Sequence, residues 1–237
     1  MKKTPALPGI IHSAPPDRFE RALRFLLRHW LLWLNLGIGL YALVPWLSPL
    51  ARLAGWEMLG QILFRLYSPP ICHQQPASSY FLGGYQVAYC QRDTAIYTTI
   101  FLAGLLFGLL RHRARPWPWW ALGLCTLPLA LDGLTQAPRA ILSDWALRTE
   151  NAWAVALTGG ILPPDFYVGD GFGTLNWLLR TVTGMLFAVG LVSTFYPLIE
   201  EGIKGQRQEA GGKWKGQGAG GRTQDARNQK LAVKRQE

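Results

Sequence analysis

Apolar residues in the middle of the chain fall into four long runs without a charged residue, at 30–50, 94–110, 116–131 and 181–199. A bilayer core about 30 Å thick selects helices of about 20 consecutive apolar residues. The runs therefore predict an all-α fold with four transmembrane helices, roughly at 30–48, 94–110, 118–136 and 174–198. We expect a polytopic membrane protein with interfacial helices in its outer loops.

The third run is the least typical of a membrane span. It contains Pro128 and ends close to Asp132 and Gln136. A proline in a spanning helix is tolerated when neighbouring groups satisfy the carbonyl that it leaves free. We therefore keep this run as a span and treat its polar end as a candidate site.

Shorter segments outside the runs have one polar and one apolar face. Residues 17–29 place three arginines along one face and leucines along another, which predicts an interfacial helix leading into the first span. Residues 53–66 repeat a polar residue every four positions, which predicts a second helix on the outer surface. The uncharged stretch 152–164 is too short to span comfortably and predicts a re-entrant or interfacial segment.

Positive charge is concentrated in three parts of the chain. Of 24 Lys and Arg residues, six precede the first span, three lie in 111–117 and nine follow residue 200, while the remaining six accompany seven acidic residues between the spans. Basic residues accumulate on the cytoplasmic side of membrane proteins. The distribution predicts a multi-pass cell-membrane protein with both termini in the cytoplasm and loops 49–93 and 137–173 outside.

The same pattern divides the chain into three regions. Residues 1–29 form a cytoplasmic amphipathic segment, 30–200 the four-helix membrane domain, and 201–237 a basic tail whose Gly, Gln, Lys and Arg content predicts disorder. Orientation in the membrane explains the net charge of +10, so no nucleic acid is expected as a partner. The expected partners are the lipid bilayer and either further copies of the chain or other membrane subunits.

The first outer loop contains a group of metal-ligand residue types, namely Cys72, His73, Cys90 and Asp93. Two thiols, one imidazole and one carboxylate are ligands for zinc or another divalent transition metal. The spacing matches no zinc-finger pattern, and adjacent residues seldom ligate one ion with good geometry. A Cys72–Cys90 disulfide, which an oxidising outer face favours, and separate structural roles stay open as alternatives. Cys125, inside the third span, is expected to be an apolar packing residue.

Polar side chains also lie near the outer ends of the third and fourth spans. Asp132 and Gln136 are four residues apart and share a helix face, as do Asn176 and Arg180. A carboxylate at membrane depth is costly, so it normally faces a partner, an ion or a cavity. Arg180 is the expected counter-ion of Asp132, either in a buried ion pair that fixes helix register or in a cavity that binds a cation or an anionic headgroup.

These motifs together resemble domain-of-unknown-function family 2085 of bacterial and archaeal predicted membrane proteins. The matching stretches are Cys72-His73-Gln74, 81–86, 90–97, 131–136 and 176–184. The resemblance implies a small helical membrane protein but carries no activity with it. In this chain Asp93 stands where the family often has a second Cys, and Asp can ligate a metal but cannot form a disulfide. That difference favours a metal site over a Cys-x-x-Cys oxidoreductase.

The sequence leads to one main hypothesis and two alternatives. The main one is divalent-metal binding at the outer membrane surface, with Asp132 and Arg180 holding the site or a path inward. An open metal position could activate water for hydrolysis of a lipid-linked substrate, whereas a closed site would be structural. The alternatives are a small-solute or proton transport or assembly component that uses Asp132 and Arg180, and a disulfide-stapled or thiol-exchanging membrane protein. Whether the chain is an enzyme stays open.

Overall fold

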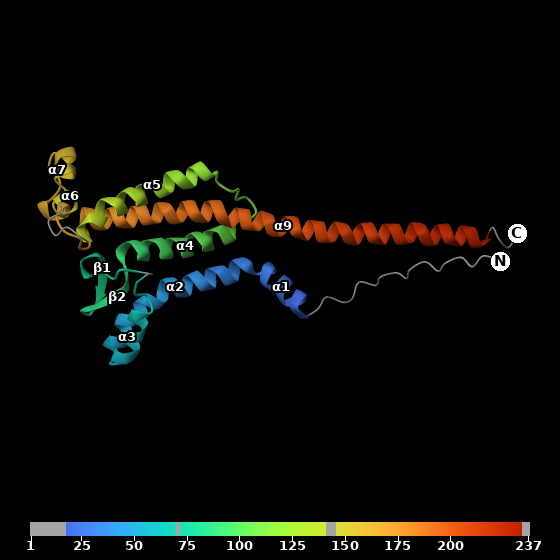
Figure 1. Ribbon diagram of the computed structural model, residues 1–237, viewed down its shortest axis with the longest axis horizontal. Coiled ribbons are helices and arrows are strands. Elements are labelled where there is room, and N and C mark those ends of the chain that lie inside the picture. Colours follow the sequence, from blue (N-terminus) through green and yellow to red (C-terminus); the bar gives the residue numbers. More distant parts are fainter. Residues whose placement is uncertain (1–17, 70–71, 141–145, 234–237) are drawn as a thin grey trace.

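The chain folds into a helical bundle with a small hairpin at one end (Figure 1). The structure is a computed structural model, and it describes residues 18–69, 72–140 and 146–233, with side chains as far as Gly205 except at a few positions. The elements are α1 Arg18–Arg28, α2 Trp30–Leu53, α3 Glu57–Arg65, β1 Ser79–Leu82, β2 Tyr85–Cys90, α4 Gln91–Leu110, α5 Trp119–Gln136, α6 Ala146–Thr149, α7 Ala152–Thr158, α8 Pro164–Tyr167 and α9 Leu175–Val233, with 3₁₀ turns at Pro76–Ser78 and Ala137–Ala140.

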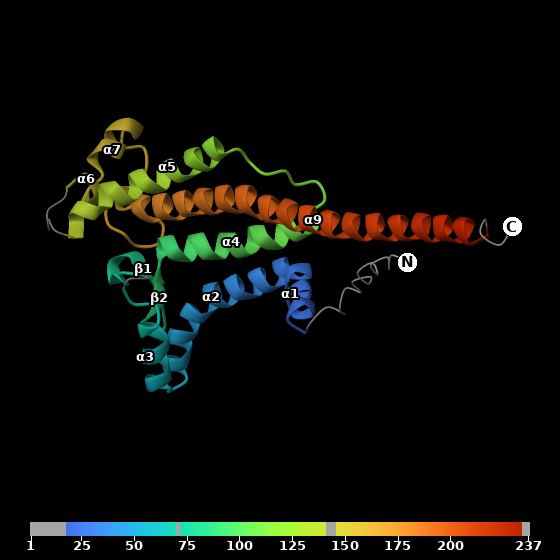
Figure 2. The same ribbon diagram turned by 45° about the vertical axis from the view of Figure 1, so that its right-hand side comes forward.

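Helices α4, α5 and α9 run side by side, and α2 packs on α4 (Figures 1 and 2). Small residues allow the close approach. A Cβ placed on Gly190 of α9 would lie 2.7 Å from the Cβ of Cys125 on α5. A Cβ on Gly184 would lie 3.2 Å from the backbone oxygen of Arg92 at the start of α4. Cys125 is therefore a packing residue, as its place in an apolar run predicts.

In the part of the chain that the structure describes, three helices are long and apolar enough to cross a membrane: α2, α4 and residues 175–205 of α9. The third predicted segment, 118–136, forms a helix, α5, nearly at the predicted bounds, and it lies in the same bundle. It is not among the three because polar residues at its end, Asp132 and Gln136 among them, lower its mean hydropathy. The predicted helices at 17–29 and 53–66 also form, as α1 and α3.

Helix α9 continues well beyond the bundle (Figure 1). It reaches Val233, so its backbone is helical in a region where the composition predicts disorder for 201–237. Its one internal proline is Pro197, and no proline follows to interrupt the i to i−4 hydrogen bonds. The Lys, Arg, Gln, Glu and Ala residues of this region have high intrinsic helix propensity, whereas its eight glycines between residues 202 and 221 have low propensity.

The hairpin is an element that the all-α prediction does not include. Strands β1 and β2 pair antiparallel, with Leu82 opposite Tyr85, and their turn is Gly83-Gly84. Both glycines have positive φ, 57° and 84°, as a primed two-residue hairpin turn requires. The hairpin matters for the site because β2 ends at Cys90, immediately before α4.

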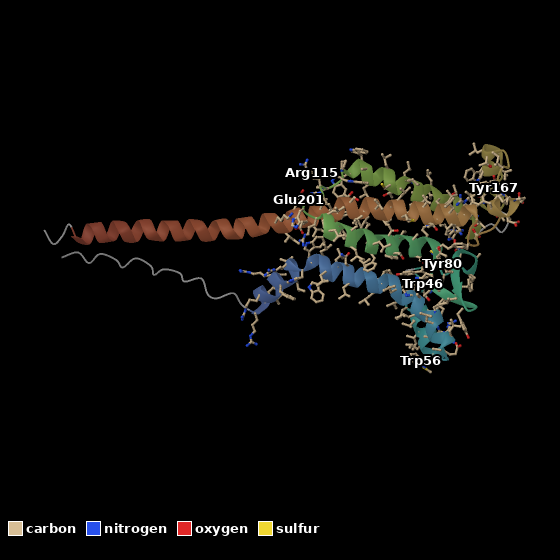
Figure 3. All side chains as sticks on the ribbon, turned by 180° about the vertical axis from the view of Figure 1, so that it is seen from behind. Trp46, Trp56, Tyr80, Arg115, Tyr167 and Glu201 are labelled. Carbon is tan, nitrogen blue, oxygen red and sulfur yellow. The ribbon has the colours of Figure 1, made fainter. Side chains whose placement is uncertain are left out.

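The bundle has two chemically different ends. Tyr80 and Tyr167 mark the end with the hairpin and α6 to α8, while Arg115 and Glu201 lie together at the opposite end (Figure 3). At the Arg115 end, the buried Glu200 carboxylate accepts hydrogen bonds from Trp30 Nε1 at 3.0 Å and from Arg111 Nη2 at 2.6 Å. These bonds join Glu200 of α9 to α2 and to Arg111, the residue that follows α4. The candidate site lies at the other end.

Candidate functional site

A polar cavity of about 440 Å³ lies at the hairpin end of the bundle. Its wall combines the loop that begins at Cys72, the start of α4, the end of α5, Asp170 and Arg180 of α9. Six of the sequence-predicted site residues line it: Cys72, His73, Cys90, Asp93, Gln136 and Arg180. The two groups of residues that stand far apart in the sequence therefore face one cavity.

Cys72, Cys90 and Asp93 converge most closely. One potential ligand atom of each lies within 4.8 Å of the other two. Cys90 is the residue before α4 and Asp93 lies in its first turn, at the spacing of a capping box, so their side chains face each other. The Cys90 thiol accordingly donates to Asp93 Oδ2 at 3.3 Å. All three cysteines are free thiols, so the Cys72–Cys90 pair is not a disulfide in this structure.

Cys72 is held by the backbone around it. Its side chain is 2% exposed, and its sulfur accepts hydrogen bonds from the N–H groups of Gln74 at 3.5 Å and Cys90 at 3.3 Å. Such donors stabilise a thiolate, which is the form that binds metals.

Gln74 adopts a left-handed backbone with φ 49°, which is uncommon for a residue other than glycine. Its side-chain nitrogen donates to the carbonyls of Phe64 at 2.7 Å and Ala88 at 3.1 Å, and its side-chain oxygen accepts from Ser68 at 3.0 Å. These bonds hold the strained conformation. Gln74 thereby fixes the position of Cys72, a role that the sequence analysis did not assign to it.

The two thiols titrate as a pair. Hydrogen bonding from Cys90 lowers the pKa of Cys72, and burial opposes that shift. The bond to Cys72, burial and the Asp93 charge raise the pKa of Cys90 well above its usual range. One thiolate, on Cys72, is therefore favoured, and a second negative charge beside it is costly without a cation.

His73 is separated from this group. Its side chain is exposed and lines the cavity, but it does not converge with the two cysteines and Asp93. Adjacent residues in an irregular loop point in different directions, and Cys72 is the one turned inward. The predicted four-residue ligand set is therefore assembled as three residues with His73 on the cavity wall.

Asp132 has different partners from the one predicted. Its carboxylate pairs with Arg92 Nη2 at 2.5 Å and with Arg148, and it also accepts a bond from Gln136 Nε2 at 3.1 Å. The predicted direct pair with Arg180 is wrong, because two arginines closer to Asp132 occupy both of its oxygens. Burial lowers the pKa of Arg148, and Asp132 opposes that shift.

Arg180 pairs with Asp170 Oδ1 at 2.7 Å. Its guanidinium also donates to the Gln136 side-chain oxygen at 2.9 and 2.6 Å and to Gln91 Oε1 at 3.2 Å. Asp170 is buried, at 7% exposed, although it stands in a stretch rich in glycine and proline. Gln136 links the two ion clusters, because its amide donates to Asp132 and accepts from Arg180.

Asn176 does not line the cavity. It is fully buried, and its side-chain nitrogen donates to the carbonyls of Arg148 at 2.7 Å and Gly169 at 2.9 Å. Asn151, also fully buried, donates to the carbonyl of Tyr167 at 2.7 Å. These two amides anchor the segment between α6 and α9, so the position of Arg148 beside Asp132 depends on them.

The residues that the sequence analysis missed are of two kinds. Gln91 and Arg92 lie between Cys90 and Asp93 in a stretch that was already singled out, and a charge at the start of a predicted span was the signal for Arg92. Arg148 lies in the four-residue helix α6 and Asp170 in the irregular segment before α9. Both segments are too short or too irregular for periodicity, so no sequence pattern placed these residues near α5 or α9.

Comparison with known proteins agrees with the membrane interpretation. Residues 72–163 match a family described as "Predicted membrane protein (DUF2085)", which confirms the resemblance carried by the sequence motifs. An uncharacterized protein of Methanocaldococcus jannaschii is 30% identical over 98 residues, which cover 40% of this chain and 62% of that relative. No solved structure matches the chain significantly.

Proposed function

Because residues 72–163 match a family of predicted membrane proteins, we propose that this chain is an integral protein of the cell membrane that binds a divalent transition metal, such as zinc, at its outer face. Cys72, Cys90 and Asp93 are the proposed ligands. The observation that carries the proposal is the convergence of their ligand atoms within 4.8 Å of one another on the wall of a polar cavity.

The proposed membrane arrangement has four spans, α2, α4, α5 and the first part of α9. Helix α5 packs along α9, which supports counting α5 as a span. The exposed leucines of α5 would then face lipid. The accumulation of Lys and Arg at both termini and at 111–117 supports a cytoplasmic position for the Arg115 end. The cavity then opens on the outer side.

The coordination chemistry of the three residues suits zinc. Two thiolates and one carboxylate are suitable ligands for a borderline cation. The charge of the cation offsets the repulsion among the three negative groups. A bound metal would take a fourth ligand either from water in the cavity or from His73, which lines the cavity wall. Three protein ligands with one open position is the arrangement of catalytic zinc sites, whereas a closed set of four is structural.

Elemental analysis of the detergent-purified protein, with free-thiol counting before and after chelation, tests this proposal. We expect near-stoichiometric metal and two thiols that become reactive when a chelator removes it. Cys90→Ser should lose most of the metal because serine is a poor ligand for zinc. Cys125→Ser is the matched control: it makes the same chemical change in α5, away from the cavity, and should retain the metal.

Full metal occupancy in Cys90→Ser would rule out the proposed ligand set. Absence of metal together with two oxidised thiols would instead support the disulfide alternative.

A second candidate function is small-solute or proton transport, and the position of Asp132 favours it. The polar cavity includes the neighbouring Gly133 and Gln136, while Asp132 and Arg148 line a separate apolar cavity of about 330 Å³ between α5 and α9. A carboxylate between two cavities could relay a proton. This function would require further copies of the chain or other subunits. At a temperature well below its own unfolding midpoint, Asp132→Asn should abolish flux in proteoliposomes without removing metal. Unchanged flux would exclude it.

A further inference from the structure

Arg92 is the guanidinium that faces the polar cavity with hydrogen-bonding capacity to spare. Its side chain is 25% exposed and lines the cavity wall. A guanidinium has five N–H donors. Among the residues that the structure describes, Asp132 is the one hydrogen-bonding partner of this group, and Arg92 Nε is buried without a partner. Arg180, by contrast, distributes its donors over Gln136, Gln91 and Asp170.

The three arginines of this ion cluster differ in how far they reach the cavity. The guanidinium groups of Arg92, Arg148 and Arg180 are paired with the carboxylates of Asp132 and Asp170, and Asp93 lines the same cavity as Arg92. The side chains of Arg148 and Arg180 are 4% and 5% exposed, whereas that of Arg92 is 25% exposed. Arg92 is therefore the guanidinium that an anion in the cavity would reach.

Other cavity groups can donate to the same anion. His73 and Gln75 are exposed side chains on the cavity wall, and neither has a side-chain partner within the described ranges. They lie on the loop that carries Cys72 and line the same cavity as Arg92 of α4. A tetrahedral oxyanion can accept bonds from such separated directions, whereas a planar carboxylate offers two oxygens in one plane.

We propose that the cavity binds a phosphate ester, with the phosphate held by the guanidinium of Arg92 and assisted by His73 and Gln75. The cavity volume of about 440 Å³ leaves room for the organic part of the ester beside the phosphate. Contact of a phosphate oxygen with a metal on Cys72, Cys90 and Asp93 rests on the proposed function. The contact with Arg92 does not depend on the metal.

The test is a titration of the detergent-purified full chain, metal-free and zinc-loaded, by isothermal calorimetry. The probes are inorganic phosphate, glycerol 3-phosphate and short-chain phosphatidic acid, with acetate as the planar carboxylate. We expect both esters to bind more tightly than acetate. Preference for phosphatidic acid over glycerol 3-phosphate would identify a lipid headgroup as the source, and the reverse order a soluble ester; both results support a phosphate-ester site.

Arg92→Gln should weaken binding of the preferred ester on the order of tenfold or more, with and without zinc, because it removes a charge-assisted fork of donors. Arg111→Gln is the matched control, since Arg111 is 27% exposed and pairs with one buried carboxylate, as Arg92 does. It lies at the opposite end of the bundle and should change the affinity less than about twofold. If Arg92→Gln does not fold, Arg92→Lys keeps the charge beside Asp132 but loses the fork and should still weaken binding.

Two results would overturn this inference: no binding of any phosphate probe to the metal-free and zinc-loaded chain, or binding that Arg92→Gln and Arg92→Lys leave unchanged. Equal affinity for acetate would also contradict it. Metal content is measured on the same samples, so failure of zinc to bind is seen separately from failure of the ester to bind.

Discussion

Single residues decide the geometry of this site through hydrogen bonds that join distant parts of the chain. Asp132 is 5% exposed and holds Arg92 from the start of α4 and Arg148 from the second outer loop. Gln74 holds Cys72 through contacts with the end of α3 and with β2. Both residues belong to motifs visible in the sequence, but their partners become visible only in the folded chain.

Asp132→Asn should destabilise the protein strongly. The change leaves the buried guanidinium of Arg148 and the partly exposed guanidinium of Arg92 without this carboxylate, and breaking a buried ion pair costs about 3–5 kcal/mol. The measurement is the thermal unfolding midpoint in detergent. Asp165→Asn, at an exposed position on the second outer loop, removes the same charge and should leave the midpoint close to that of the wild type. Equal midpoints for the two variants would contradict a structural role for Asp132.

Gln74→Gly should weaken metal binding on the order of tenfold, the usual effect of removing a group that orients a ligand. Glycine tolerates the positive φ at this position, so the variant removes the side-chain hydrogen bonds without adding backbone strain. A competition titration with a zinc-binding dye gives the affinity. Gln75→Gly is the neighbouring control, and an equal loss in both variants would show that the loop, not the Gln74 side chain, matters.

At the scale of elements, the site is built where irregular segments meet helix ends. Strand β2 delivers Cys90 to the start of α4, and the end of α5 brings Gly133 and Gln136 to the same cavity. The helices themselves contribute rigid packing through small residues such as Gly190. Disturbing the hairpin should therefore affect the site first, whereas disturbing the helix contacts should affect the whole bundle.

Gly84→Ala should destabilise the hairpin by about 1 kcal/mol, because alanine in the left-handed region clashes with its own backbone. Space is not the cause, since a Cβ at Gly84 would have no neighbour within 4 Å. Gly171→Ala also adds a methyl group in open space, but without a positive φ, and serves as the control. Hydrogen exchange of the β1 and β2 amides measures the effect, and equal protection in both variants would contradict it.

Gly190→Ala should lower the stability of the bundle by about 1–3 kcal/mol, the usual cost of overpacking. Its new Cβ would lie 2.7 Å from Cys125 Cβ, and the added Cys125→Gly should restore part of the loss. Gly123→Ala, on α5 with no atom within 4 Å of the new Cβ, should cause no loss. Thermal unfolding in detergent compares the variants, and absence of rescue by Cys125→Gly would argue against this contact.

At the scale of the whole molecule, the bundle separates a basic end from a polar-cavity end. Arg115 and Glu201 lie close together at the first end, and Tyr80 and Tyr167 mark the second (Figure 3). Arg115 precedes α5, and α9 begins at the cavity end. Helix α5 therefore carries the chain from the Arg115 end to the cavity end before α9 runs back. If α5 crosses the membrane, Arg115 and Glu201 lie on the same side of it. If α5 does not cross, they lie on opposite sides.

Epitope tags at Arg115, at Asp165 and after Glu201 test the proposed topology in intact cells. With four spans, an external antibody should reach the Asp165 tag and neither of the others without permeabilisation. If α5 does not cross, the Arg115 and Glu201 tags will lie on opposite sides of the membrane. The assay thus distinguishes three spans from four, and permeabilised cells provide the control for tag expression.

The sequence alone determined the helical elements, because long uncharged runs and amphipathic periodicity depend on neighbouring residues in the chain. Helices α2, α4, α5 and the beginning of α9 lie close to their predicted bounds. Sequence also grouped Cys90 with Asp93 as candidate ligands, whereas the structure shows that they share the start of a helix, where a spacing of three brings two side chains to one side.

Tertiary structure decided which distant groups meet. The partners of Asp132, the separation of His73 from the two cysteines and the burial of Asp170 depend on how irregular loops pack against helix ends, and no periodicity encodes that packing. The choice between Arg180 and the pair Arg92 and Arg148 was decided by distance in space, because ion pairing in a buried region depends on which charged groups the fold brings within hydrogen-bonding range.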